Sequence, residues 1–216
     1  MNKTLTMAEE LLLLGLHDEK GTFLTAASLG MTYGLAGAMI IDLAQAGLVR
    51  IEGKDLVASP RGSARDEILD EVLEGVRSSP KVRSLGHWVG HFGRSGKFKK
   101  RFLARLAGKG IVAHEEGRFL GIFPTSRYPQ LDPRPEAGVR ERVRSGIMGA
   151  ASPGEREGAL ISLVHACDLV GVLFEKGERR EAKAKAKEIS RRQPIGSAVA
   201  RAVEAVRAAV IAAAAS

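Results

Sequence analysis

The segment from Arg94 to Lys109 is the densest region of positive charge in the sequence, and it contains no acidic residue. Phe98, Phe102 and Leu106 recur within it at helical spacing, which predicts an amphipathic helix with its basic residues opposite these apolar ones. Such a face suits phosphate-bearing ligands, and near an anionic membrane each cation contributes about 1 kcal/mol. The alternative is an ordinary solvated face, which is common for runs of charge. The residues that we predict to bind an anionic lipid headgroup are Lys99, Lys97, Lys100, Arg101 and Arg94.

Two other groups of residues have side chains suited to chemistry but lack the arrangement that it needs. His87 and His91 stand four residues apart, as zinc ligands on a helix do, yet no carboxylate lies between them and no third ligand is evident. His165, Cys167 and Asp168 are so close in the chain that they point to different faces of a helix, which excludes a nucleophilic relay. No glycine-rich piece has the spacing of a phosphate-binding loop. We therefore predict no catalytic residue, no metal and no cofactor, and expect that the chain is not an enzyme.

The N-terminal part of the chain predicts a helix, a short strand, a second helix and a hairpin. Thr6 and Glu9 form a capping box that begins a helix ending near Leu16. Residues 22–25 are rich in β-forming types and predict a short strand. A helix over 34–46 has few polar positions, so we expect neighbours to cover most of its circumference. After it, residues 46–57 alternate apolar and polar types around a glycine, which predicts a β-hairpin.

The order of helix, glycine, strand, turn and strand recurs further along the chain. Residues 109–112 and 115–120 predict a second hairpin, after the basic helix over 97–107. Between the two units we expect a helix over 64–78, N-capped by Ser63, and a helix that carries Trp88.

The C-terminal part of the chain predicts helices after an exposed loop over 124–135, which is rich in proline. We expect a polar helix over 136–148, a helix over 155–174 that is apolar on nearly all sides, a charged helix over 177–192 and an alanine-rich helix after residue 194. A helix that is apolar all round usually lies at the centre of a bundle. The predicted fold is therefore mainly α, a central helical bundle with two small helix-plus-β-hairpin units, in one domain spanning residues 1–216.

The composition is that of a basic protein with a substantial core. The 216 residues are 44% hydrophobic, and 33 lysines and arginines exceed 25 acidic residues, which gives a formal net charge of +8. The single cysteine cannot form an internal disulfide, which favours a cytoplasmic location. The apolar run Leu11–Leu14 is too short for a signal sequence or a transmembrane span. We therefore expect any membrane contact to be peripheral.

Several segments, in order, resemble the Golgi phosphoprotein 3 family over nearly the whole chain. They are Leu5–Leu16, Gly34–Ala44, Leu69–Glu71, Trp88, Arg105–Ile111 and Leu160–Asp168. Abundant alanine, glycine and arginine are typical of a GC-rich genome, so we expect a divergent, prokaryotic-type member. The resemblance implies a mainly helical fold, peripheral binding to phosphatidylinositol 4-phosphate, and adaptor contacts with the tails of membrane proteins. No catalysis accompanies it.

The resemblance also implies a headgroup pocket made of one tryptophan and three arginines, and most of these residues differ here. Ala36 and Gly96 stand at two arginine positions, Lys99 stands at the third, and Leu24 or Thr25 stands at the tryptophan position. A lysine is a point charge, whereas an arginine fork binds phosphate at two points. By analogy, homo-oligomers would form near Phe123–Leu131. Shallow membrane insertion would involve the proline-rich loop or residues 22–29.

Two other functions compete with membrane binding. A helix followed by a hairpin is also the order of a winged helix, which would make the chain a nucleic-acid-binding protein. The helix over 34–46 has no lysine or arginine and cannot neutralise phosphates, so nucleic acid is the weaker prediction. The other alternative is a purely structural interaction protein.

Overall fold

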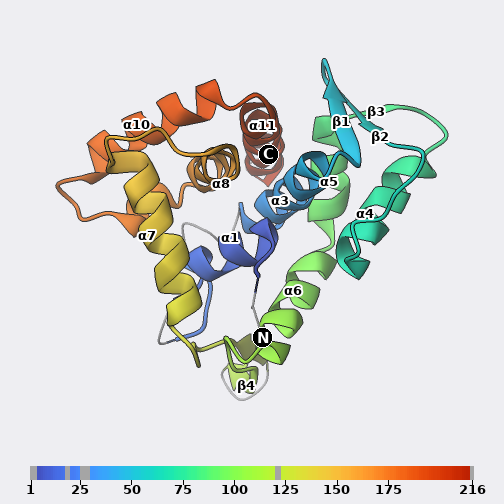
Figure 1. Cartoon of the computed structure of the whole chain (residues 1–216). Helices are drawn as coiled ribbons and strands as arrows, with labels where there is room; N and C mark the ends of the chain where they lie inside the picture. Colours follow the sequence, from blue (N-terminus) through green and yellow to red (C-terminus); the bar gives the residue numbers. More distant parts are fainter. Residues whose placement is uncertain (1–3, 18–19, 25–29, 120–122, 215–216) are drawn as a thin grey trace.

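The computed structural model describes residues 4–17, 20–24, 30–119 and 123–214. The fold is mainly α with two small antiparallel sheets, which confirms the predicted fold class (Figure 1). The first elements are α1 (Met7–Gly15), α3 (Met31–Gln45), β1 (Val49–Glu52), β2 (Asp55–Ala58), α4 (Glu67–Arg77), β3 (Arg83–Ser84), α5 (Leu85–Arg94) and α6 (Lys97–Gly108). The remaining elements are β4 (Glu115–Phe119), β5 (Phe123–Arg127), α7 (Arg134–Met148), α8 (Glu155–Ala166), α9 (Val170–Leu173), α10 (Arg179–Arg192) and α11 (Pro194–Ala214).

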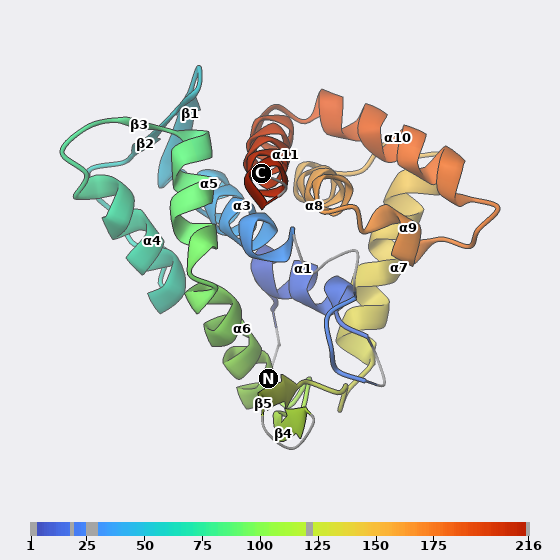
Figure 2. The same ribbon diagram turned by 180° about the vertical axis from the view of Figure 1, so that it is seen from behind.

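Helix α3 lies at the centre of the molecule, where α1, α5, α8 and α11 pack around it (Figures 1 and 2). Its residues are buried on nearly every side, as its uniformly apolar sequence predicted. It begins at Met31, three residues before the predicted start. A Cβ atom added to Gly37 would lie 2.7 Å from Val199 Cγ1, so the glycine allows α11 to approach closely.

Helix α1 lies beside α3 and begins with the predicted capping box. The Thr6 N–H donates to Glu9 Oε2 at 2.8 Å, and the Glu9 N–H donates to Thr6 Oγ1 at 3.3 Å. Every residue of α1 is buried, including the carboxylates of Glu9 and Glu10. The short strand predicted after α1 is reduced to one bridge between Leu16 and Phe23, and residues 25–29 lie outside the described part of the chain.

The first predicted hairpin is confirmed as β1 and β2, joined through Gly53 at a φ of +62°. Strand β3 adds a short third strand against β2. The predicted start of the next helix was wrong. Arg65 has a φ of +54°, which ends any helix there, so α4 begins later and its N-cap is Asp66 rather than Ser63.

The second predicted hairpin was paired wrongly. Strand β4 pairs with β5, which lies in the stretch predicted to be an irregular loop. Ile111 and Val112 are buried in the core, and Val112 makes only an isolated bridge, to Gln130. The prolines of the stretch 124–135 favour an irregular loop, but both strands of a two-stranded sheet have a free edge, where a proline is tolerated.

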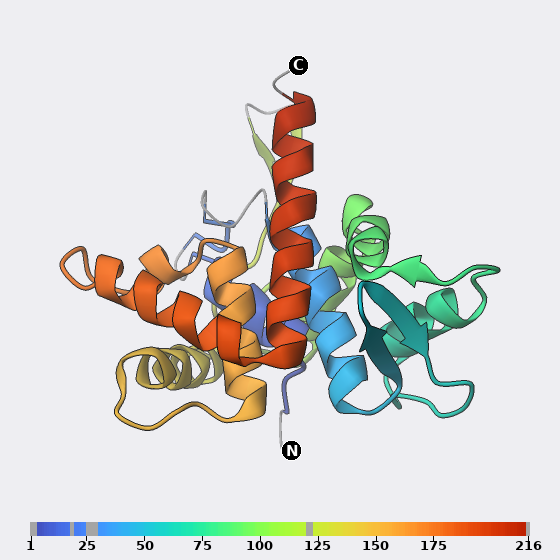
Figure 3. The ribbon, with the colours of Figure 1, turned by 90° about the horizontal axis from the view of Figure 1, so that it is seen from above.

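The long apolar helix predicted over 155–174 was also wrong, because the chain turns after α8. Asp168 takes a left-handed conformation with a φ of +58°, and the Leu169 N–H donates to the Val164 carbonyl at 2.9 Å. Helices α7, α10 and α11 confirm the predicted ones with small changes of boundary. Figure 3 shows the C-terminal end of α11 projecting beyond the other helices. Among the described helices, none is both long and apolar enough to cross a membrane.

Two helical glycines test the close packing of α3. We expect Gly37→Ala to lower the free energy of unfolding by about 1–3 kcal/mol, because the new methyl group would overlap Val199. Gly138→Ala in α7 is the matched control: nothing lies within 4 Å of its added Cβ, so alanine should raise the free energy of unfolding by about 0.5–1 kcal/mol. Urea denaturation followed by circular dichroism measures both. A Gly37→Ala variant as stable as Gly138→Ala would contradict the proposed packing.

Candidate anion-binding site at the junction of α5 and α6

Helix α6 starts at a sharp turn after α5. Gly96 has a φ of +62° and no side chain to cap the new helix. The predicted apolar row is confirmed, because Phe98, Phe102 and Leu106 are all buried. The cations of α6 are therefore distributed over the rest of its surface, and their neighbours decide which of them remain unpaired.

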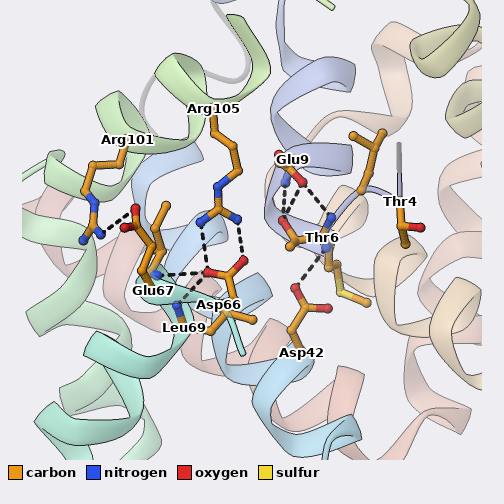
Figure 4. A network of polar contacts seen from close by, with 12 residues as sticks. Thr4, Thr6, Glu9, Asp42, Asp66, Glu67, Leu69, Arg101 and Arg105 are labelled. Carbon is orange, nitrogen blue, oxygen red and sulfur yellow. Dashed lines mark hydrogen bonds and ion pairs between the residues drawn. The ribbon is translucent and has the colours of Figure 1, made fainter. Parts of the chain in front are cut away.

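One row of α6 cations faces the carboxylates of α4 and is neutralised there (Figure 4). Lys97 Nζ lies 2.5 Å from Glu71 Oε1, and Arg101 pairs with Glu71 and, at 3.3 Å, with Glu67. The hydrogen bond from Lys97, which outweighs the opposing effect of burial, holds the pKa of Glu71 below its ordinary value. The paired cations of α6 and its C-cap are Lys97, Arg101, Arg105 and Lys109.

Arg105 makes the most complete of these contacts. Its guanidinium binds Asp66 at two points, with Nη1–Oδ2 at 2.5 Å and Nη2–Oδ1 at 2.9 Å. Asp66 also caps α4 by accepting from the N–H groups of Ile68 and Leu69. Burial by itself would raise the pKa of Asp66, but Arg105 and the two N–H groups hold it below its ordinary value. This carboxylate therefore fixes the start of α4 against α6.

The other three predicted headgroup-binding residues have no carboxylate partner among the described residues, unlike Lys97 and Arg101. Arg94, Lys99 and Lys100 form no ion pair with any carboxylate in the described part of the chain, and we call them the junction cations. Lys99 is half-buried, with Nζ 4.6 Å from the centre of the Phe23 ring. Burial, and then the charge of Lys100, lower the pKa of Lys99. Arg94 and Lys100 are exposed. The structure thus divides the five predicted residues into a paired group and an unpaired group.

The positions implied by the family resemblance are only partly suited to a ligand. Ala36 is fully buried within α3, so it cannot contact a headgroup at the surface. Nothing lies within 4 Å of a Cβ added to Gly96, so no neighbour fills the space of the missing side chain. Leu24 is half-buried, and Thr25 lies outside the described residues. The sequence reasoning missed Phe23, because no local pattern connects it with Lys99.

A second group of charged residues was not predicted from the sequence, and three of them, Glu10, Arg142 and Arg156, line a cleft of about 990 Å³ between α1, α7 and α8. Arg156 contacts Asp42 at 3.0 Å and Glu10 at 3.2 Å, and Arg142 contacts Glu10 at 2.6 Å. Burial, which Arg156 opposes, raises the pKa of Asp42 to about 6. Asp42 and Arg156 are 114 residues apart in the chain, so only the packing of α8 near α3 brings them together.

The histidines and the cysteine considered from the sequence lie in ordinary surroundings. The rings of His87 and His91 stack with their centres 6.0 Å apart. Cys167 is fully buried, which raises the pKa of its thiol to about 12, and Asp168 pairs with Lys183 at 2.9 Å. Within the described residues, no group of three or more potential ligands is placed to hold a metal ion.

Comparison with known proteins shows which proteins the chain resembles. The model of the family described as Golgi phosphoprotein 3 (GPP34) matches residues 7–206. Vacuolar protein sorting-associated protein 74 of Eremothecium gossypii is 26% identical over 167 residues, covering 67% of this chain and 50% of that protein. Its namesake in Schizosaccharomyces pombe is 26% identical over 163 residues, covering 65% and 48%. The chain thus spans about half the length of these relatives.

The contact between Asp66 and Arg105 makes a testable contribution to stability. We expect Arg105→Gln to lower the free energy of unfolding by about 1–3 kcal/mol, because a half-buried carboxylate loses its charged partner. Lys100→Gln, which removes an exposed and unpaired charge from the same helix, should change stability by less than about 0.5 kcal/mol. Equal effects in urea denaturation would show that the contact does not hold α4 and α6 together.

Asp42 predicts a pH dependence of stability. Its pKa is raised from 3.8 to about 6, so between these values the folded chain holds a proton that the unfolded chain has released. The free energy of unfolding of the wild type should therefore fall relative to Asp42→Asn as the pH rises from about 4 to above 6, by at most about 3 kcal/mol. Urea denaturation of both proteins across this range measures the difference. A difference that is constant, or that grows with pH, would contradict the raised pKa.

Proposed function

The chain belongs to the Golgi phosphoprotein 3 family, and we propose that it is a non-catalytic module that binds anionic membranes at the α5–α6 junction. The ligand is a phosphate-bearing lipid headgroup of the phosphatidylinositol 4-phosphate type. The contacting residues are the junction cations Arg94, Lys99 and Lys100. Attachment is peripheral and takes place at the cytoplasmic side of the membrane.

The observation that carries this proposal is that Lys99 is half-buried beside Phe23 without any carboxylate partner in the described part of the chain. Partial burial disfavours the charged form of a lysine, and a bound anion would restore the balance. Other cations of α6 already have carboxylate partners on α4. On α6, an acidic ligand therefore meets unpaired charge at Lys99 and Lys100, and Lys97 and Arg101 support it indirectly by holding the helix in place.

The arrangement supports general recognition of negative charge more than recognition of one headgroup shape. Lysine offers a point charge, and no arginine fork stands at position 36 or 96. Three cations at about 1 kcal/mol each give weak, salt-sensitive binding. A second attachment is then required for stable residence on a membrane. Contacts with the tails of membrane proteins, or a homo-oligomer, would supply it, and the relatives named for vacuolar protein sorting favour such an adaptor role.

Nucleic-acid binding is less well supported. In a winged-helix protein the recognition helix must be exposed, whereas α3 is covered by other helices. The basic helix α6 is exposed in part, but both of its arginines, Arg101 and Arg105, pair with carboxylates of α4 and its N-cap. The phosphates of a nucleic acid would therefore meet few unpaired cations on this helix.

Vesicle flotation tests the proposal. We expect the chain to float with phosphatidylcholine vesicles that contain phosphatidylserine or phosphatidylinositol 4-phosphate, and to remain unbound with phosphatidylcholine alone. Binding should fall steeply with salt. The triple variant Arg94→Gln, Lys99→Gln, Lys100→Gln should lose about 100-fold in vesicle affinity, because about 3 kcal/mol of attraction is removed.

The matched control removes the same amount of charge elsewhere. Lys176→Gln, Arg180→Gln, Arg201→Gln alters exposed residues that have no ion pair in the described structure, and it should float like the wild type. Equal loss in both triple variants would mean that net charge alone drives binding and would overturn the assignment to the junction. No flotation of the wild type at low salt would overturn membrane binding itself, as would tighter binding to duplex DNA than to anionic vesicles.

A further inference from the structure

A second, smaller pocket is lined by residues of β2, α4, β3 and α5. These elements lie on the opposite side of the molecule from α7 and α10 (Figure 2). Strand β2, the end of α4, the turn before β3 and the start of α5 enclose about 170 Å³. Its lining contains Arg77, Lys81 and Arg83 and no acidic residue. None of these three cations forms an ion pair with a carboxylate in the described part of the chain. The pocket is therefore strongly electropositive.

Trp88 contributes a hydrogen-bond donor to this region. Its side chain is almost completely buried, stacks on Phe92 with ring centres 5.2 Å apart, and lines the pocket. The indole Nε1 has no hydrogen-bond acceptor, and among the described residues it is the one buried side-chain polar atom in this condition. An unpaired N–H in a protein interior is costly, so such a group is expected to have a use.

Arg77 is positioned at the wall of the pocket with donors to spare. Its Nε donates to the Ser59 carbonyl at 2.8 Å and its Nη2 to the Gly62 carbonyl at 2.9 Å, which fixes the guanidinium. These carbonyls do not neutralise its charge, and three of its five N–H donors remain. Lys81 and Arg83 are exposed at the rim. A fixed arginine backed by flexible cations is an arrangement that binds phosphate well.

We propose that this pocket binds a single phosphate group, presented by a soluble phosphate ester or by a lipid headgroup. The arginine and the indole N–H hold the phosphate oxygens, and the rim cations attract the charge. The volume exceeds the roughly 10–15 Å³ needed for one water but lies below the roughly 300 Å³ at which pockets for drug-sized ligands begin. This site is separate from the junction cations and does not depend on the proposed membrane function.

Binding should change the surroundings of Trp88. The Nε1 atom is fully covered, so a phosphate oxygen reaches it only when the atoms that cover it move aside. Trp88 is the single tryptophan of the chain, so any change in indole fluorescence comes from this residue.

The test is a fluorescence titration at constant ionic strength. Inorganic phosphate or glycerol phosphate should produce a saturable change in Trp88 emission, whereas chloride at the same ionic strength should not. Phosphatidylcholine vesicles with phosphatidylinositol 4-phosphate form a second arm. A response to both arms assigns the site to any accessible phosphate, a response to soluble phosphate alone assigns it to soluble esters, and a response to vesicles alone assigns it to lipid.

Variants connect the signal with the pocket. Lys81→Gln, Arg83→Gln should raise the apparent dissociation constant by about tenfold or more, whereas the matched control Lys176→Gln, Arg180→Gln should leave it unchanged. Trp88→Phe keeps the aromatic stack but removes the donor, and calorimetry with phosphate should show binding weakened several-fold. No saturable response in either arm, an equal response to chloride, or equal losses in the two double variants would overturn the proposal.

Discussion

Helix α3 carries no charged residue other than Asp42, so its whole circumference has to be covered by other elements. Helices α1, α5, α8 and α11 provide this cover, and Gly37 allows α11 to approach closely. The carboxylate of Asp42 is enclosed as a result, and it needs hydrogen bonds from the Met7 N–H and from Arg156. The start of α1 and the start of α8 are thus fixed to the central helix by a single buried charge.

A second constraint acts through α4, which sits against α6 by means of carboxylates. Asp66 both caps α4 and binds Arg105, while Glu71 binds Lys97 and Arg101. These contacts place most of the positive charge of α6 in structural roles. The net charge of +8 is therefore a poor guide to where an anion binds, because the ligand responds to unpaired charge and not to the total.

Two clusters of cations without carboxylate partners in the described part of the chain are candidate anion sites, the α5–α6 junction and the pocket beside Trp88. Helix α5 joins them, since Trp88 stands near its start and Arg94 at its end. The Trp88 ring stacks on Phe92, and Phe92 meets Phe98 of α6 edge to face, which gives the two sites a shared support. The aromatic contacts of α5 therefore fix the positions of both candidate sites relative to each other.

The sequence by itself determined the helices whose apolar spacing is regular, the capping box of α1, the hairpin around Gly53 and the apolar face of α6. These features depend on hydrogen bonds and periodicities within a few residues, which the local sequence encodes. The sequence also placed Arg94, Lys97, Lys99, Lys100 and Arg101 in one candidate site. Only the tertiary structure decided which of them remain unpaired, because Glu71 is 30 residues away from Arg101 in the chain. The same holds for Phe23 beside Lys99 and for the pairing of β4 with β5. Contacts of this kind arise where distant segments pack together, and no local pattern specifies them.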